Sequence, residues 1–354
     1  MTAKRTASIK GGMHASEELS RLVEMSARIG AEPNLIQGPG GNTSLKQGEF
    51  LVVKASGFWL ANAMDENIFV TLSLPAIRER IATGQGDDFL SCLVGDTSLK
   101  PSIETAFHAL LPHRVVIHAH AYNCMAISTM PDGKQRFLTA MGPAISGAWV
   151  PYRRPGGPLA HEIAAILAQR PVDVLLLQNH GVVVGANSAE AAEALLHDVE
   201  QRLALQERAR LAVEWTRVVA HTTPDYLPDP VSSDIALDPE LVRIAGHLPL
   251  IPDQVVFLGG AVCVADPALG IDRTAAAVKV ASGVQPGFVL LPGVGAYRWV
   301  GRAKAADPLI DGLVALLRRL PSGIEVNTLT IADTAELLGW DAEHYRQRLD
   351  RKYA

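Results

Sequence analysis

Three histidines follow short apolar segments, where an imidazole that becomes buried needs a polar partner. His118 and His120 come directly after the β-branched residues 115–117, and His180 lies three positions beyond the leucines 175–177. Residues two apart on a strand project to the same side, so we expect His118 and His120 to point together. Imidazole is a preferred zinc ligand, and a catalytic zinc site takes about three protein ligands with one position open. We therefore predict that His118, His120 and His180 bind Zn2+ or another divalent cation, although each histidine alone is also explained as a hydrogen-bonded core residue.

Glu104 is the carboxylate best placed to act beside such a cation. It lies at the start of a helix predicted over residues 103–111, just before the strand that carries His118 and His120. A carboxylate near a metal can serve as a general base. A carboxylate in the first turn also stabilises the helix dipole, and the residues alone leave that structural explanation open. His108 follows one turn later on the same helix face and could orient Glu104.

Short helices and strands must hold these side chains in place. Hydrophobic spacing and end signals predict helices over residues 15–30, 76–83, 103–111, 159–169 and 188–211. Short apolar or β-branched runs predict strands over residues 49–57, 115–119, 172–177 and 182–184. The alternation of helices and strands indicates an α/β fold for this part of the chain.

A proline-rich segment divides the chain. Residues 223–240 contain four prolines with many acidic and small residues, which is typical of a linker. We therefore predict one domain over residues 1–222 and a smaller α/β domain of unknown role over residues 241–354. For the second domain the pattern predicts helices at 240–246, 307–320 and 333–350, with strands at 254–258, 261–265 and 286–291.

The glycines of Pro292-Gly293-Val294-Gly295 do not indicate a dinucleotide fold. The third glycine of that fingerprint is missing, and the next residues, 296–300, favour a strand where a helix would be required. A hairpin turn explains the segment better, so we do not predict a dehydrogenase.

Composition excludes several other classes of protein. The chain has 354 residues with a net charge of −5 and no basic block, which argues against nucleic-acid binding. Its apolar runs are too short to span a membrane. No apolar stretch follows the charged N-terminus, so we expect no secretory signal and a cytoplasmic location. The three cysteines are far apart and form no CxxC pair, which indicates neither a disulfide framework nor a thiolate metal site.

Four motifs stand in an order that resembles the class II aldolase/adducin family. They are residues 41–44 (GNTS), 102–104 (SIE), 118–120 (HAH) and 179–181 (NHG), and the resemblance covers about residues 15–215. The first two motifs, together with residues 53–57 (VKASG), look closer to the aldolase half of bifunctional aldolase/dehydrogenase proteins. The resemblance implies a three-layer α/β/α sandwich around a mainly antiparallel sheet, assembled as a homotetramer.

The resemblance also assigns roles to residues. His118, His120 and His180 would be the zinc ligands and Glu104 the acid/base residue. The pocket for a sugar or sugar-phosphate substrate would be formed by Asn42, Thr43, Ser44, Ser56, Gly57 and Ser102. Two departures stand out. Ile103 replaces a hydroxyl residue of the phosphate aldolases, and Phe137 replaces the tyrosine that protonates the leaving aldehyde, for which Tyr122 and Tyr152 are the candidates.

The implied activity is a retro-aldol cleavage of a ketose or sugar acid, with or without a phosphate. Breaking a carbon–carbon bond beside a carbonyl leaves an enediolate, and a zinc ion that binds its oxygens stabilises the negative charge. The alternatives are an epimerase or decarboxylase of the same family, which would use the same enediolate, or an adducin-like interaction protein without activity. A protein that only binds partners has no reason to keep three metal-spaced histidines and the carboxylate.

Overall fold

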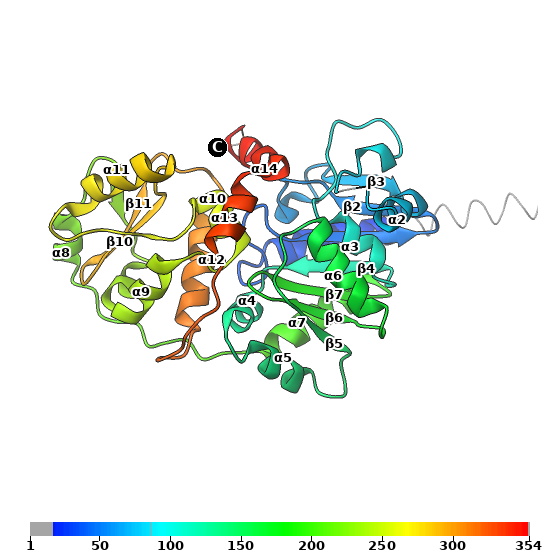
Figure 1. Ribbon diagram of the computed structural model, residues 1–354, viewed down its shortest axis with the longest axis horizontal. Coiled ribbons are helices and arrows are strands. Elements are labelled where there is room, and N and C mark those ends of the chain that lie inside the picture. Colours follow the sequence, from blue (N-terminus) through cyan, green and yellow to red (C-terminus); the bar gives the residue numbers. More distant parts are fainter. Residues whose placement is uncertain (1–16, 86, 353–354) are drawn as a thin grey trace, which may run out of the picture. The chain divides into compact units, whose positions relative to one another are not determined.

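The chain separates into two compact units in the computed structural model, which describes residues 17–85 and 87–352 (Figure 1). Unit 1 contains the described residues up to Ala121, with Phe137–Leu177 and Gly181–Leu203; unit 2 contains Tyr122–Arg136, Gln178–His180 and the described residues from Ala204 onward. Residues 1–16, which belong to the N-terminal segment where no secretory signal is expected, lie outside the described residues.

Seven strands of the described chain form the large sheet of unit 1. Its order is β3-β2-β1-β4-β7-β6-β5, and every neighbouring pair is antiparallel except β5 and β6. In chain order the strands are β1 (Asn42–Gln47), β2 (Phe50–Lys54), β3 (Phe69–Ser73), β4 (Val115–Ala119), β5 (Gly147–Val150), β6 (Val174–Leu177) and β7 (Gly181–Ala186). The predicted strands at 49–57, 115–119, 172–177 and 182–184 are confirmed within a few residues.

Helices cover both faces of this sheet. One face packs against α2 (Leu74–Ala82), α3 (Thr105–Leu110) and α6 (Gly157–Leu167). The other face carries α7 (Ala189–Arg202) and the helix over residues 17–30, which are joined to each other by the ion pairs Arg21–Glu190 and Arg28–Glu193. Two short 3-10 helices, η1 (Leu60–Asn62) and η2 (Leu90–Cys92), complete this unit. The predicted three-layer α/β/α sandwich around a mainly antiparallel sheet is confirmed.

The central strand β4 is buried along its whole length and alternates between the two faces. Val116 packs with Phe107 of α3 and Ile163 of α6, in one apolar cluster of fully buried side chains. Since His118 lies two residues after Val116, its side chain projects to the same face, where α3 begins. The core on this face therefore brings the start of α3 to the histidine end of β4.

Unit 2 is built around a smaller sheet, as predicted for the C-terminal part. Its order is β8-β11-β10-β9, with only the β9–β10 pair parallel. The strands are β8 (Tyr226–Pro228), β9 (Cys263–Val264), β10 (Phe288–Leu291) and β11 (Gly295–Trp299). The helices are α8 (Trp215–Ala220), η3 (Ser233–Leu237), α9 (Pro239–His247), α10 (Pro252–Leu258), α11 (Gly270–Ser282), α12 (Ala306–Arg318), α13 (Ile331–Leu338) and α14 (Asp341–Lys352). In the chain, α4 (Tyr122–Thr129) and α5 (Gly133–Met141) follow β4.

Three predicted elements differ from the structure. The strand predicted at 254–258 is wrong: the segment is α10, which has Pro252 in its first turn and the left-handed Gly259 after its end. The helix predicted at 188–211 begins at its capping residue Ser188 as expected but ends at Arg202. The helix predicted at 333–350 is two helices that break at Gly339-Trp340.

The predicted hairpin is confirmed, because β10 and β11 pair in antiparallel fashion across residues 292–294. All three cysteines are buried and unbridged. Within the described residues no single helix is long and apolar enough to cross a membrane. Only α9 and α10 together reach that length, and they are bent by 80° relative to each other.

Candidate metal centre

The structure brings the three predicted ligands together. His118, His120 and His180 each offer a ring nitrogen within 4.8 Å of the others, and all three side chains are buried. The Nε2 atoms of His118 and His120 are 3.1 Å apart. Two ligand nitrogens bound to one tetrahedral zinc are about 3.3 Å apart, given bond lengths of about 2.0–2.1 Å. The donor set therefore fits a single divalent cation.

Strand register explains why these side chains meet. His118 on β4 lies between Asn42 of β1 and Val183 of β7. His180 belongs to the short turn that joins β6 to β7, because Leu177 pairs with Gly181 on either side of it. A Cβ atom added to Gly181 would lie 2.4 Å from the Ala119 carbonyl oxygen and 3.1 Å from the His120 ring. Only glycine allows the start of β7 to approach the histidines of β4 this closely.

A backbone contact fixes the proton on one of the three rings. The Nδ1 atom of His118 lies 3.1 Å from the Val182 carbonyl oxygen, an acceptor that requires an N–H on that nitrogen. When the ring is neutral, the Nε2 atom of His118 carries the lone pair and faces His120. Metal-binding histidines typically donate their other N–H group to a carbonyl or carboxylate in this way. This tautomer supports the metal-binding interpretation of His118.

Glu104 lies beside these histidines and is 4% exposed. Its Oε2 atom is 3.4 Å from Nε2 of His118 and accepts a 2.7 Å hydrogen bond from the Asn42 side-chain amide. Glu104 is the N-cap residue of α3, immediately outside the helix, and its own side chain does not cap it. The carboxylate is therefore directed toward the histidine cluster, which favours a chemical role over the helix-dipole explanation.

Five of the six predicted substrate residues lie near Glu104 or near one another. Asn42 bonds the Glu104 carboxylate, and the Ser102 hydroxyl accepts from the Glu104 backbone N–H at 3.2 Å. Ser56 donates its backbone N–H to the Lys100 carbonyl, beside a β-bridge that runs next to Ser102. Gly57 follows in the left-handed region with φ of 81°. The fifth residue, Ser44, lies on the same strand face as Asn42.

Thr43 projects to the opposite face of the sheet. Its hydroxyl lies 2.7 Å from the hydroxyl of Ser26, on the helix over residues 17–30. Strand alternation alone would have separated Thr43 from Asn42 and Ser44, since successive side chains point to opposite faces. The structure thus leaves Thr43 apart from the other predicted substrate residues.

His108, which the sequence suggested could orient Glu104, is connected to that carboxylate in the structure. It reaches Glu104 through Asn42: its Nε2 atom contacts the Asn42 side-chain oxygen, and its Nδ1 atom lies 2.7 Å from the Ser44 hydroxyl. The side chain is completely buried. Burial, with smaller contributions from the nearby charges of Lys46 and His118, lowers the pKa of His108 well below its usual value. The ring is therefore neutral.

The two tyrosines proposed as proton donors, Tyr122 and Tyr152, are both partly buried. Phe137, which occupies the position of the expected tyrosine, is fully buried. Tyr122 begins α4, and burial raises its pKa to about 12, with the charge of Asp311 as the next cause. Its hydroxyl therefore stays protonated at neutral pH and can donate. The Arg319 guanidinium lies 5.2 Å from the Tyr122 ring centre.

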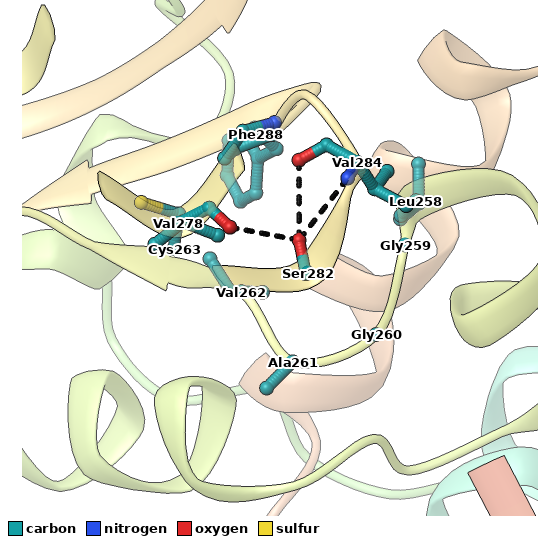
Figure 2. A pocket seen from close by; sticks show the side chains of 11 residues that line it. Leu258, Gly259, Gly260, Ala261, Val262, Cys263, Val278, Ser282, Val284 and Phe288 are labelled. Atoms are coloured by element: carbon teal, nitrogen blue, oxygen red, sulfur yellow. Dashed lines mark hydrogen bonds between the residues drawn. The ribbon is translucent and has the colours of Figure 1, made fainter. Parts of the chain in front are cut away.

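A separate pocket lies in unit 2 between the loop after α10 and the end of α11 (Figure 2). Most of the residues that line it have apolar side chains or are glycines. The hydroxyl of Ser282 is directed at the backbone, 2.9 Å from the Val278 carbonyl and 3.3 Å from the Val284 carbonyl (Figure 2). Burial raises the pKa of the Cys263 thiol to about 11, so this thiol is protonated at neutral pH. The pocket offers no group suited to catalysis.

About half of this chain is similar to parts of known proteins. An uncharacterized oxidoreductase of Bacillus subtilis, YuxG, is 34% identical over 188 residues; the match covers 49% of this chain and 27% of that longer protein. The N-terminal class II aldolase domain of a conserved Thermoplasma acidophilum protein shares 26% identity over 52% of this chain and 90% of that one, with a TM-score of 0.46. A sugar-phosphate aldolase from Thermotoga maritima shares 14% identity over 54% of this chain and 93% of that one, with a TM-score of 0.42.

The family model described as the class II aldolase and adducin N-terminal domain matches residues 20–206, more than half of the chain. The match includes the three histidines and the carboxylate that the structure brings together. The chain therefore belongs to the class II aldolase and adducin family.

Proposed function

We propose that the chain is a lyase that cleaves a carbon–carbon bond of a ketose or sugar acid by retro-aldol chemistry. It uses a divalent cation, and zinc is the first candidate. One observation carries this proposal: three buried imidazoles gather within 4.8 Å, and the Glu104 carboxylate lies 3.4 Å from one of them. Family membership supports aldolase-type chemistry on a small sugar-like molecule in general terms.

The residues have distinct roles in this proposal. A cation held by His118, His120 and His180 would act as a Lewis acid for negative charge that develops on substrate oxygens. Glu104 takes the proton from, or returns it to, the carbon next to the carbonyl, which is the task of a general base. The Asn42 amide holds one carboxylate oxygen in place by its 2.7 Å hydrogen bond.

Hydrogen bonding favours a substrate without a phosphate at this end of β1. Asn42 and Ser44 were predicted to bind the substrate, but their side chains are bonded to Glu104 and His108. Ile103 supplies no hydroxyl at a position where the phosphate aldolases carry one. Sugar acids and unphosphorylated ketoses are therefore the first compounds to test.

We further propose that the aldolase-like domain spans residues 1–222 and that a smaller domain covers residues 241–354. The segment 223–240, predicted to be a linker, contains β8, which pairs with β11, and η3, so it is a folded part of unit 2. The family match ends at residue 206 and supports placing the chemistry in the first of these parts. The homotetramer implied by the family is part of the proposal, and light scattering of the purified protein tests it.

Metal analysis followed by substrate screening tests the function. We expect about one divalent ion per chain and aldehyde release from a ketose or sugar acid. The Glu104→Gln variant should lose activity by about 10²–10⁴-fold and keep its metal, while Glu66→Gln, which alters an exposed carboxylate, should behave as wild type.

The other outcomes separate the alternatives. Metal-free protein, or full activity in Glu104→Gln, would contradict the proposal. Release of carbon dioxide or inversion of a hydroxyl-bearing carbon without cleavage would instead indicate a decarboxylase or an epimerase. A fully metal-loaded protein that turns over nothing would favour the adducin-like interaction role.

A further inference from the structure

Four buried side chains of unit 1 form an unbroken hydrogen-bond chain that ends on Glu104. The Ser44 hydroxyl lies 2.7 Å from Nδ1 of His108, Nε2 of His108 contacts the Asn42 oxygen, and the Asn42 amide nitrogen lies 2.7 Å from Glu104 Oε2. The four side chains are at most 5% exposed. Strand β1 supplies Asn42 and Ser44, and the start of α3 supplies Glu104 and His108.

When Glu104 is ionised, the donors and acceptors of these hydrogen bonds can be assigned in only one way. A carboxylate only accepts, so the NH2 group of Asn42 must face Glu104 and its oxygen must face His108. That oxygen requires an N–H on Nε2 of His108. The neutral ring then has a bare Nδ1, which accepts the hydroxyl proton of Ser44. The lowered pKa of His108 agrees with a ring that carries a single proton.

We propose that His108 and Ser44 are positioning residues that hold the Glu104 carboxylate for catalysis through the amide of Asn42. This inference rests on the proposed function of Glu104 as the acid/base residue. The amide cannot take up or release a proton at neutral pH, so the imidazole is insulated from the carboxylate. A proton on Glu104 is therefore not passed to His108 through Asn42.

The geometry explains why this arrangement uses these positions. Asn42 and Ser44 are two residues apart on β1, so their side chains lie on the same face and contact the two nitrogens of the His108 ring. His108 lies one helical turn after Glu104, so ring and carboxylate share a face of the chain at the start of α3. The side chain of Thr43, which lies between Asn42 and Ser44, points to the opposite face of the sheet and is hydrogen-bonded to Ser26.

The tautomer of His108 tests the direction of the hydrogen bonds from Ser44 to Glu104, and measuring it requires no enzymatic activity. Nitrogen NMR of the metal-free 354-residue chain, labelled with 15N-histidine, reports which ring nitrogen carries the proton, and His108→Gln identifies the signal. We expect a protonated Nε2 and a bare Nδ1. A ring protonated on Nδ1, or on both nitrogens, at neutral pH would overturn the proposal.

Two variants of His108 separate positioning from mere packing. His108→Phe keeps a ring but loses both hydrogen bonds, and we expect kcat to fall about 10–100-fold, with KM within about threefold and metal content unchanged. Glutamine can donate to Asn42 and accept from Ser44, so His108→Gln should recover to within about fivefold of wild type. Ser44→Ala should lose about fivefold, whereas the control Ser26→Ala, which removes a buried hydroxyl from the opposite face, should stay within twofold.

Equal activity in the phenylalanine and glutamine variants would overturn the positioning role. A crystal structure of metal-free His108→Phe gives a readout that does not depend on the reaction. We expect the Asn42 amide and the Glu104 carboxylate to be displaced in it, and unchanged positions of both would refute the inference. A wild-type protein that fails to turn over any substrate would contradict the proposed function, while the NMR and crystallographic results would still decide whether His108 orients Glu104.

Discussion

Replacing Lys46 with methionine is expected to stabilise the protein at acidic and neutral pH. Lys46 lies on β1 and is only 8% exposed, and its ammonium group donates a 2.7 Å hydrogen bond to the His113 carbonyl. Burial lowers its pKa from 10.5 to about 7, with the positive charge of Arg78 as the second cause. Methionine has a similar length and no charge, so it removes the cost of burying the ammonium group.

The magnitude follows from the two pKa values. Between about pH 7 and pH 10.5 the unfolded chain binds a proton at Lys46 that the folded protein does not bind, so the stability contributed by Lys46 rises with pH across this window. Below pH 7 the full cost is present, and the difference in pKa corresponds to about 5 kcal/mol. The substitution also leaves the His113 carbonyl without its donor, which costs about 1–3 kcal/mol. We therefore expect a net gain of about 2–4 kcal/mol at pH 6 and a gain near zero at about pH 9.5.

Urea unfolding of wild type and Lys46→Met at the two pH values measures this difference. Lys134→Met, which changes an exposed lysine, is the matched control and should leave the pH dependence unaltered. The reasoning is refuted if Lys46→Met changes the free energy of unfolding by the same amount at both pH values. Destabilisation at pH 6 would show that the hydrogen bond to His113 outweighs the cost of burial.

Two further substitutions test the packing around the site and in unit 2. Gly181→Ala places a methyl group 2.4 Å from the Ala119 carbonyl oxygen, so we expect a loss of about 1–3 kcal/mol in unfolding free energy and reduced metal content, and retention of both would contradict the account. Arg346→Met removes the buried guanidinium that lies 3.0 Å from Asp253 and 2.9 Å from Glu343, so we expect destabilisation by about 3–5 kcal/mol at neutral pH. An unchanged urea midpoint in that variant would show that this ion-pair network contributes nothing.

The strand that carries the histidines could be predicted because its signal is local. Residues 115–117 are β-branched and apolar, and side-chain alternation alone places His118 and His120 on one face. The hairpin at residues 292–295 was predictable for the same reason, since its glycines lie between two short apolar runs. In each case a few neighbouring residues determine the geometry.

The segment 254–258 shows where local patterns fail. A short run of valine, phenylalanine and leucine fits a buried strand and a buried helix equally well. The decisive signals were the flanking residues: Pro252 suits the first turn of a helix, and Gly259 adopts the left-handed conformation that ends one. Weighing those two residues above the β-branched composition would have given α10.

The hydrogen-bond chain behind Glu104 could not be derived from one sequence. Asn42 and His108 are 66 residues apart, and their contact depends on the register between β1 and β4 and on how α3 packs against them. The helical spacing of Glu104 and His108 indicated a connection between the two. That the connection passes through Asn42, a residue expected to bind substrate, is a consequence of tertiary packing.

The central claim is that three imidazoles, two at the end of β4 and one in the turn between β6 and β7, hold one cation beside Glu104. Anomalous diffraction from crystals grown with zinc, collected on either side of the zinc absorption edge, tests it most directly. The account predicts one strong peak within ligand distance of His118, His120 and His180. A crystal with no peak there, or with zinc bound only elsewhere on the chain, would contradict it.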